Sequence, residues 1–193
     1  AWYLTWQYEN GDREKAKEKF SQIQKHEYPY WHEIRPITFL IQNGEFEIAK
    51  LIFSRMKNVD QMSCYIVDLY NAGKKEEALK AFYDNYTKSE DIVLHLANVL
   101  STLTGEDDKA NYANVKKLLT SDKCISQHGN YLLNKKKVNE ALEMFRKIKG
   151  QKYGSKATFS LFNIHMDDVC KEFHQKFPSS EIYRIMGVRF YNG

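Results

Sequence analysis

The chain has 193 residues, of which 42% are hydrophobic, and a formal net charge of +4. A chain of this length can bury a sizeable core. Its small net charge does not indicate a global affinity for nucleic acid or acidic membranes. No apolar run reaches the ~18 residues of a membrane span. Nine Gly and three Pro among many Lys, Glu, Ala and Leu favour helix over strand. Cys64, Cys124 and Cys170 form no CxxC pair and fit reduced thiols, so we expect an all-α cytoplasmic protein.

A spaced pattern of three residues recurs along the chain: a Gly, then Ala five residues on, then Phe four residues later. A turn glycine followed by a small and a large residue one helical turn apart suits a helix hairpin whose second helix packs closely on its first. In the last occurrence Lys136 stands where the Gly would be. The four segments are Gly11-Ala16-Phe20, Gly44-Ala49-Phe53, Gly73-Ala78-Phe82 and Lys136-Ala141-Phe145.

The first two helix pairs are marked by turn, cap and proline signals. Asn10-Gly11 predicts the turn of the first pair, and Asp12 predicts the cap of its second helix. Pro29 breaks the chain before the second pair. The first helix of that pair is expected to start or kink at Pro36.

The next pairs are less uniform. The third pair turns at Gly73, and residues 87–90 resemble a capping box that places a helix start near Ser89. The fourth pair turns at Gly105 and has Ala110 in the small position, but no Phe follows. A fifth pair, a weaker sixth and the first helix of a seventh complete the chain.

The period of the pattern indicates the architecture. Steps of 29 to 33 residues with two helices per unit are typical of a solenoid, because one helix pair cannot bury its apolar face alone. We therefore expect a single array of about six helix pairs over residues 1–193. Both ends lack the polar terminal unit of a solenoid, so we expect the chain to be the middle of a longer multidomain protein. The positions taken as equivalent are Ala16, Ala49, Ala78, Ala110, Ala141 and Cys170.

The fifth pair carries a family resemblance. Residues 129–133, Gly-Asn-Tyr-Leu-Leu, followed by residues 138–145, Val-Asn-Glu-Ala-Leu-Glu-Met-Phe, resemble a tetratricopeptide repeat, in which a small residue of the first helix packs on the alanine of the second. Units four and six depart from the pattern, and the unit lengths scatter around the family's usual length, so the likeness is to a divergent member. The resemblance implies a right-handed α-solenoid whose first helices line a concave binding face.

Register with Gly129 selects the exposed first-helix positions that would do the recognising. Asn amides bond both N–H and C=O of an extended peptide, and Tyr gives contact area at low entropy cost. We therefore expect a protein- or peptide-binding scaffold or sensor module. The candidate binding residues are Tyr8, Thr38, Gln42, Tyr70, Asn71, Asn98, Asn130, Asn134 and Tyr191.

Catalytic and metal chemistry are not expected. His165, Cys170 and His174 are the nearest metal-like cluster, but Cys170 and His174 take the Ala and Phe places of the repeat, where a buried thiol and a half-buried imidazole are expected. No nucleophile elbow or glycine-rich phosphate loop occurs. The sequence predicts no enzyme activity, no cofactor and no metal.

Charge is concentrated in one segment. Residues 116–156 contain eleven Lys or Arg and three acidic residues, a net charge of about +8, and Lys135, Lys136 and Lys137 form a basic patch at an inter-helix turn. Such a patch attracts an acidic peptide or a nucleic-acid backbone, or keeps a repeat protein soluble.

Two alternatives to peptide binding stay open. Residues 71–82 also resemble the second helix of a pentatricopeptide repeat, a family whose resemblance implies binding of single-stranded RNA. The steps of the array are shorter than that family's units. A passive spacer between other domains is the third possibility, and it predicts no ligand.

Overall fold

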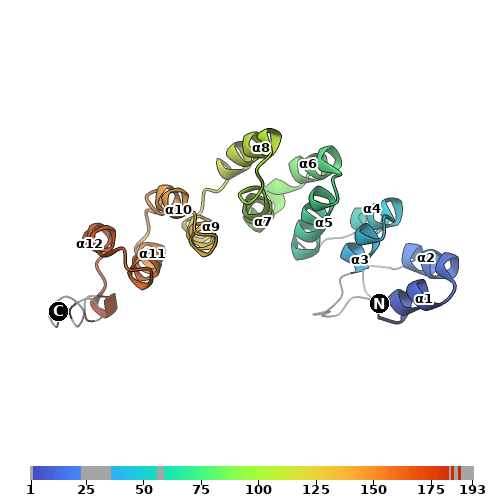
Figure 1. Ribbon diagram of the computed structural model, residues 1–193, viewed down its shortest axis with the longest axis horizontal. Coiled ribbons are helices and arrows are strands. Elements are labelled where there is room, and N and C mark those ends of the chain that lie inside the picture. Colours follow the sequence, from blue (N-terminus) through green and yellow to red (C-terminus); the bar gives the residue numbers. More distant parts are fainter. Residues whose placement is uncertain (1, 23–35, 56–58, 183, 185–186, 188–193) are drawn as a thin grey trace. The chain divides into compact units, whose positions relative to one another are not determined.

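The computed structural model describes residues 2–22, 36–55, 59–182, 184 and 187, and every element in these ranges is a helix (Figure 1). The all-α prediction is confirmed. Within the described ranges, every helix is too short or too polar to cross a lipid bilayer. The elements are α1 (Trp2–Asn10), α2 (Arg13–Gln22), α3 (Pro36–Gln42), α4 (Phe46–Ser54), α5 (Val59–Asn71), α6 (Lys75–Tyr83), the 3-10 helix η2 (Tyr86–Lys88), α7 (Glu90–Leu100), α8 (Glu106–Lys116), α9 (Asp122–Asn134), α10 (Val138–Phe145), α11 (Gln151–Asn163) and α12 (Asp167–Lys176).

Several predicted helix starts are confirmed. Pro36 is the first residue of α3 within the described ranges, and the residues before it lie outside them. The Asp12 carboxylate accepts from the Lys15 amide at 3.0 Å and so caps α2. Ser89 Oγ accepts from the Asp91 amide at 3.2 Å at the start of α7. Pro29 lies outside the described residues.

Internal contacts divide the chain into two compact units, Ala1–Leu96 and Ala97–Gly193. In the first unit α1 packs on α2, α3 on α4 and α5 on α6, and α3 also packs on α5 and α2 on α4. Aromatic pairs fill the layers between hairpins: Phe20 and Phe39 stack with ring centroids 6.1 Å apart, and Phe53 and Tyr65 stack at 4.1 Å. In the second unit α9 packs on α10, α11 on α12, and α9 on α11.

Four of the hairpins share one turn geometry, and this explains the spacing found in the sequence. At each turn one residue has a left-handed φ, and the amide of the next residue donates to the carbonyl five positions earlier, as in a Schellman motif. A fully buried small residue follows five positions later, where the second helix meets the first. The left-handed residues are Gly44 (φ 78°), Gly73 (φ 82°), Lys136 (φ 61°) and His165 (φ 61°), and the small residues are Ala49, Ala78, Ala141 and Cys170.

The lysine in this turn should be a local weakness. A left-handed φ costs a residue with a Cβ about 1–2 kcal/mol. Gly adopts this φ without steric cost, but it increases the conformational entropy of the unfolded chain. Lys136→Gly is therefore expected to raise the free energy of unfolding by about 0.5–1 kcal/mol in denaturant titrations. The matched control is Lys135→Gly, because Lys135 has a φ of −89° and gains nothing from Gly. Equal effects of the two substitutions would contradict the turn assignment.

The fourth hairpin departs from the predicted register. Gly105 has a φ of −61° and forms the N-cap of α8, so it is not a left-handed turn residue. Ala110 is exposed, and the assignment of Ala110 to the small packing position is wrong. α8 instead buries Asp108 and Val115. Beyond the C-cap of this helix, Leu119 is also buried. The same glycine-to-alanine spacing does place a buried alanine at Ala16, although Gly11 has no left-handed φ either.

Candidate binding groove

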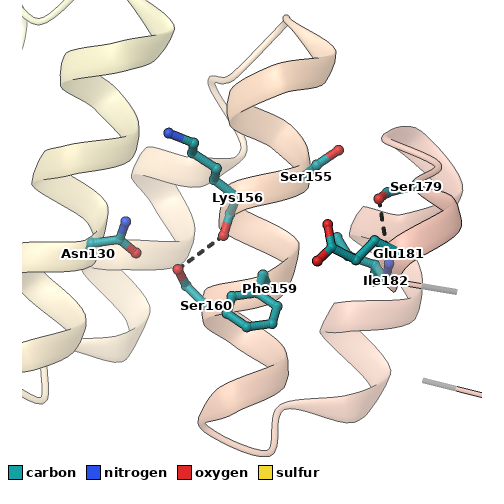
Figure 2. Close-up of a pocket in the computed structure, with 8 residues that line it drawn as sticks. All are labelled: Asn130, Ser155, Lys156, Phe159, Ser160, Ser179, Glu181 and Ile182. Atoms are coloured by element: carbon teal, nitrogen blue, oxygen red, sulfur yellow. Dashed lines mark hydrogen bonds between the residues drawn. The ribbon is translucent and has the colours of Figure 1, made fainter. Parts of the chain in front are cut away.

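A groove of about 410 Å³ opens in the second unit between α9, α11 and the segment after α12 (Figure 2). Both helices are first members of their hairpins, the class of helix that the sequence predicted to bind. Figure 2 shows the Asn130 side chain pointing from α9 toward Ser160 on α11. The lining residues are Asn130, Ser155, Lys156, Phe159, Ser160, Ser179, Glu181 and Ile182.

Two glycines bring each of these first helices close to its own partner. A Cβ placed on Gly129 would lie 2.3 Å from the Phe145 ring, and one on Gly154 would lie 2.1 Å from the Phe177 ring. Because real Cβ atoms do not approach so closely, only glycine allows these helix contacts. These contacts fix the backbones of α9 and α11 next to the groove residues Asn130 and Ser155, each of which directly follows one of the two glycines.

The third wall is held by polar contacts at the end of α12. The side-chain Nε2 of Gln151, at the start of α11, donates to the carbonyl of Pro178. Ser179 Oγ accepts from the Ile182 amide at 3.5 Å, which caps the turn that carries Glu181 and Ile182 into the groove.

The groove combines an apolar platform with polar groups of both kinds. Phe159 is 45% exposed, and Ile182 closes the wall beside it. Ser160 Oγ donates to the Lys156 carbonyl at 3.0 Å, while the half-buried Asn130 offers an amide donor and acceptor. This arrangement can hold an extended peptide with one apolar side chain on Phe159 and its backbone against Asn130.

The predicted binding residues have different surroundings. Asn130 lines the groove. Gln42, Asn71 and Asn134 are exposed, and each is the last residue of its helix, α3, α5 and α9. Tyr191 lies outside the described residues. Lys135, Lys136 and Lys137 form the loop between α9 and α10, as predicted for the basic patch.

The expectation that Tyr8 and Tyr70 are exposed is wrong. Tyr70 is 2% exposed in the core of α5, and Tyr8 is 6% exposed. The Tyr8 hydroxyl donates to Glu45 Oε1 at 2.7 Å, and Arg13 and Lys17 reach the same oxygen at 3.0 and 2.9 Å. Burial and then the Glu45 carboxylate raise the pKa of Tyr8. The tyrosine therefore joins two hairpins of the first unit and is not available to a ligand.

The Glu45 carboxylate is the common partner of Tyr8, Arg13 and Lys17. Burial alone would raise the pKa of its carboxyl, but the hydrogen bonds from Tyr8, Lys17 and Arg13 outweigh it and lower the pKa. Thr38 has a comparable role between α3 and α5, since its hydroxyl donates to Asp68 Oδ2 at 2.6 Å. Tyr8 and Thr38, which both lie on first helices, therefore connect neighbouring helices in the first unit.

Asn98 belongs to a buried network in the second unit. Its Oδ1 lies 2.7 Å from His128 Nδ1, and the Tyr112 hydroxyl lies 2.9 Å from His128 Nε2. Because Oδ1 only accepts, Nδ1 carries the proton and Nε2 accepts from Tyr112. Burial, then Lys116 and Lys147, lower the pKa of His128 to about 4. The imidazole is neutral and structural, and Asn98 orients it.

Sequence reasoning missed most of the groove. The buried residues of α11 are Gly154, Ala157, Thr158 and Leu161, which leaves Phe159 and Ser160 on the opposite side. The sequence signal is the helical spacing of Gly154, Ala157, Thr158 and Leu161, which predicts one buried face of the helix. Phe159 lies outside this face, so its ring is expected to be exposed. His128 had a similar signal, since it shares the buried stripe of Cys124, Ile125 and Leu132.

The metal-like cluster of the sequence is explained by packing. Cys170 is buried, and its thiol donates to the Thr158 carbonyl at 3.5 Å across the α11–α12 hairpin. Burial raises the pKa of that thiol to about 11, with a smaller contribution from Asp167. His174 is half-buried, as the repeat register predicted.

Comparison with protein-family models, with curated proteins and with solved structures finds no match to this chain. The functional argument therefore depends on the chain's own residues.

Proposed function

We propose that the chain is a divergent tetratricopeptide-like repeat array, a right-handed α-solenoid without catalytic activity. It binds a segment of another protein along the face of its first helices, in the groove between α9, α11 and residues 179–182. It serves as a scaffold or sensor module.

Three features support the solenoid. The same left-handed turn recurs at four hairpins. First helices pack on first helices, α3 on α5 and α9 on α11, and a second helix packs on a second, α2 on α4. Such nearest-neighbour stacking is how a repeat array buries the faces that one hairpin leaves open. No disulfide joins Cys64, Cys124 and Cys170, in keeping with the reducing cytoplasm that we propose.

The exposed Phe159 carries the binding proposal. An aromatic ring at 45% exposure in a concave site, with amide and hydroxyl groups around it, is the arrangement expected of a recognition pocket. Lys156 and Glu181 at its rim supply one charge of each sign, which favours a segment of mixed charge over a purely acidic one.

Selection of a random-peptide phage library on the full chain tests this proposal. The selected peptide is then labelled and its affinity measured by fluorescence polarisation. Phe159→Asp is expected to weaken binding at least tenfold, about 1.4 kcal/mol, because it removes the apolar platform. The matched control is Tyr83→Asp on α6 of the first unit, which removes a ring of similar exposure, 49% against 45%, that does not line the groove.

The outcomes separate the proposals. Loss of affinity in Phe159→Asp with an unchanged Tyr83→Asp supports the groove. Equal affinity of both variants and the parent contradicts it. Failure to select any peptide favours the passive spacer.

A further inference from the structure

Basic side chains gather at one edge of the second unit, where α8, α10 and α12 end and α9 and α11 begin. We call this surface the basic edge. It lies at the opposite end of the α9–α10 hairpin from the loop of Lys135, Lys136 and Lys137. Its members are Lys116, Lys117, Lys123, Arg146, Lys147, Lys149, Lys152 and Lys176.

Side-chain contacts join the helix ends that form the basic edge. Lys116 Nζ at the end of α8 lies 3.2 Å from Glu143 Oε2 on α10. Lys176 Nζ at the end of α12 donates to the Ile148 carbonyl at 3.2 Å. The Asp122 carboxylate at the start of α9 accepts from the Lys149 amide at 3.0 Å. The eight cations are therefore held on neighbouring elements.

Few acidic groups neutralise the basic edge. Asp122 is occupied by backbone amides, Glu143 by Lys116 and Lys147, and Glu172 lies 3.7 Å from Arg146. Lys116 lowers the pKa of Glu143, with Lys147 adding to the effect, so that carboxylate stays ionised. Eight cations against these three acids leave an excess of five. The three helix C-termini and the two helix N-termini at this edge together carry a net charge of only about −0.5, so most of the excess is not explained by helix dipoles.

An aromatic ring lies among these cations. Tyr153 is half-buried in the first turn of α11, and the ammonium groups of Lys152 and Lys156 lie 5.6 and 5.5 Å from its ring centroid. Ammonium groups that follow a phosphate backbone, with a ring on which a base stacks, are what sequence-tolerant single-strand binding requires. A nucleobase offers the Tyr153 ring a stacking partner that an acidic side chain does not.

We propose that the basic edge binds single-stranded nucleic acid, with its ammonium and guanidinium groups on the phosphates and Tyr153 against a base. This site shares Lys156 with the peptide groove, but it does not depend on the proposed peptide binding.

The test is fluorescence anisotropy of a labelled oligouridylate with the full chain across a sodium chloride series. Lys117 and Lys149 are exposed, so Lys117→Gln with Lys149→Gln removes two charges while leaving the Glu143 pairs intact. This double variant is expected to bind about tenfold more weakly at low salt, and its slope of log K against log salt should fall by about 1.4. The matched control is Lys135→Gln with Lys136→Gln, which removes the same charge from the opposite end of the hairpin.

The remaining outcomes decide between ligands. Tyr153→Leu should weaken binding without changing the salt slope, because it removes stacking and no charge. Equal losses in the edge and loop variants would overturn the proposal in favour of general charge attraction. Competition by polyglutamate as effective as by the oligonucleotide would assign the edge to acidic peptides, and no binding at low salt would refute it. Circular dichroism melting of each variant confirms that it is folded.

Discussion

The protein should lose about 2 kcal/mol of stability between about pH 7.5 and about pH 5 through His128 alone. Its imidazole is 0% exposed, and its pKa is lowered to about 4 by burial and then by Lys116 and Lys147. In the unfolded chain the same group titrates near its ordinary value of 6.5. Between these two values the unfolded chain binds more protons, so the free energy of unfolding decreases as the pH falls. His128 contributes about 3 kcal/mol in total to the free energy of unfolding. This contribution is complete above about pH 6.5 and is lost by about pH 4.

Denaturant unfolding monitored by circular dichroism across this pH range measures the effect. His128→Gln is the matched variant, because its amide has a donor and an acceptor for Asn98 and Tyr112 but does not titrate. It should be less stable at neutral pH and show a flatter pH dependence. Burial also raises the pKa of Tyr112, so that hydroxyl does not titrate in this range. An NMR titration that gives His128 an ordinary pKa would refute the buried network.

Gly154→Ala should lower the free energy of unfolding by about 2 kcal/mol, although alanine is the better helix former. A Cβ at this position would lie 2.1 Å from Phe177 Cγ and 2.3 Å from its Cδ1, and the Phe177 side chain is 2% exposed. Overpacking of that kind costs about 1–3 kcal/mol, more than the gain in helix propensity of about 1 kcal/mol. The ring or the whole of α12 must move to admit one methyl group.

A double-mutant cycle with Phe177→Leu shows whether this contact is responsible. The two substitutions together should cost less than the sum of their separate costs, because the smaller side chain leaves room for the methyl group. Lys156→Ala on the same helix is the control for propensity and should change stability by less than about 0.5 kcal/mol. Additive effects of Gly154→Ala and Phe177→Leu would show that the close approach is not the cause.

The sequence predicted the hairpins well because their signals are local. The turn residues, the Asp12 cap and the proline at the start of α3 each act within a few residues of the chain. Where a local signal was absent, the prediction was wrong: Gly105 is followed by no left-handed turn, and Ala110 is exposed. The left-handed turn is not the whole explanation, because Gly11 also lacks it and Ala16 is nevertheless fully buried, as the register predicts.

The binding face was harder to predict because exposure depends on residues far apart in sequence. Tyr8 has the polarity and place of a surface residue, yet Glu45, 37 residues later, removes it from solvent. Asn98 is likewise occupied by His128, 30 residues away. The groove around Asn130 is completed by residues 179–182, at the start of the predicted first helix of a seventh pair, in which the register with Gly129 selected only Tyr191.

Chemical-shift mapping of the isotopically labelled chain with the phage-selected peptide tests the central claim most directly. The account predicts amide shifts concentrated at Asn130, at Ser155–Ser160 on α11 and at residues 179–182, with saturation at a single affinity. Shifts confined to the second helices α10 and α12, or to the basic edge, would contradict the claim that this protein recognises peptides through its first helices.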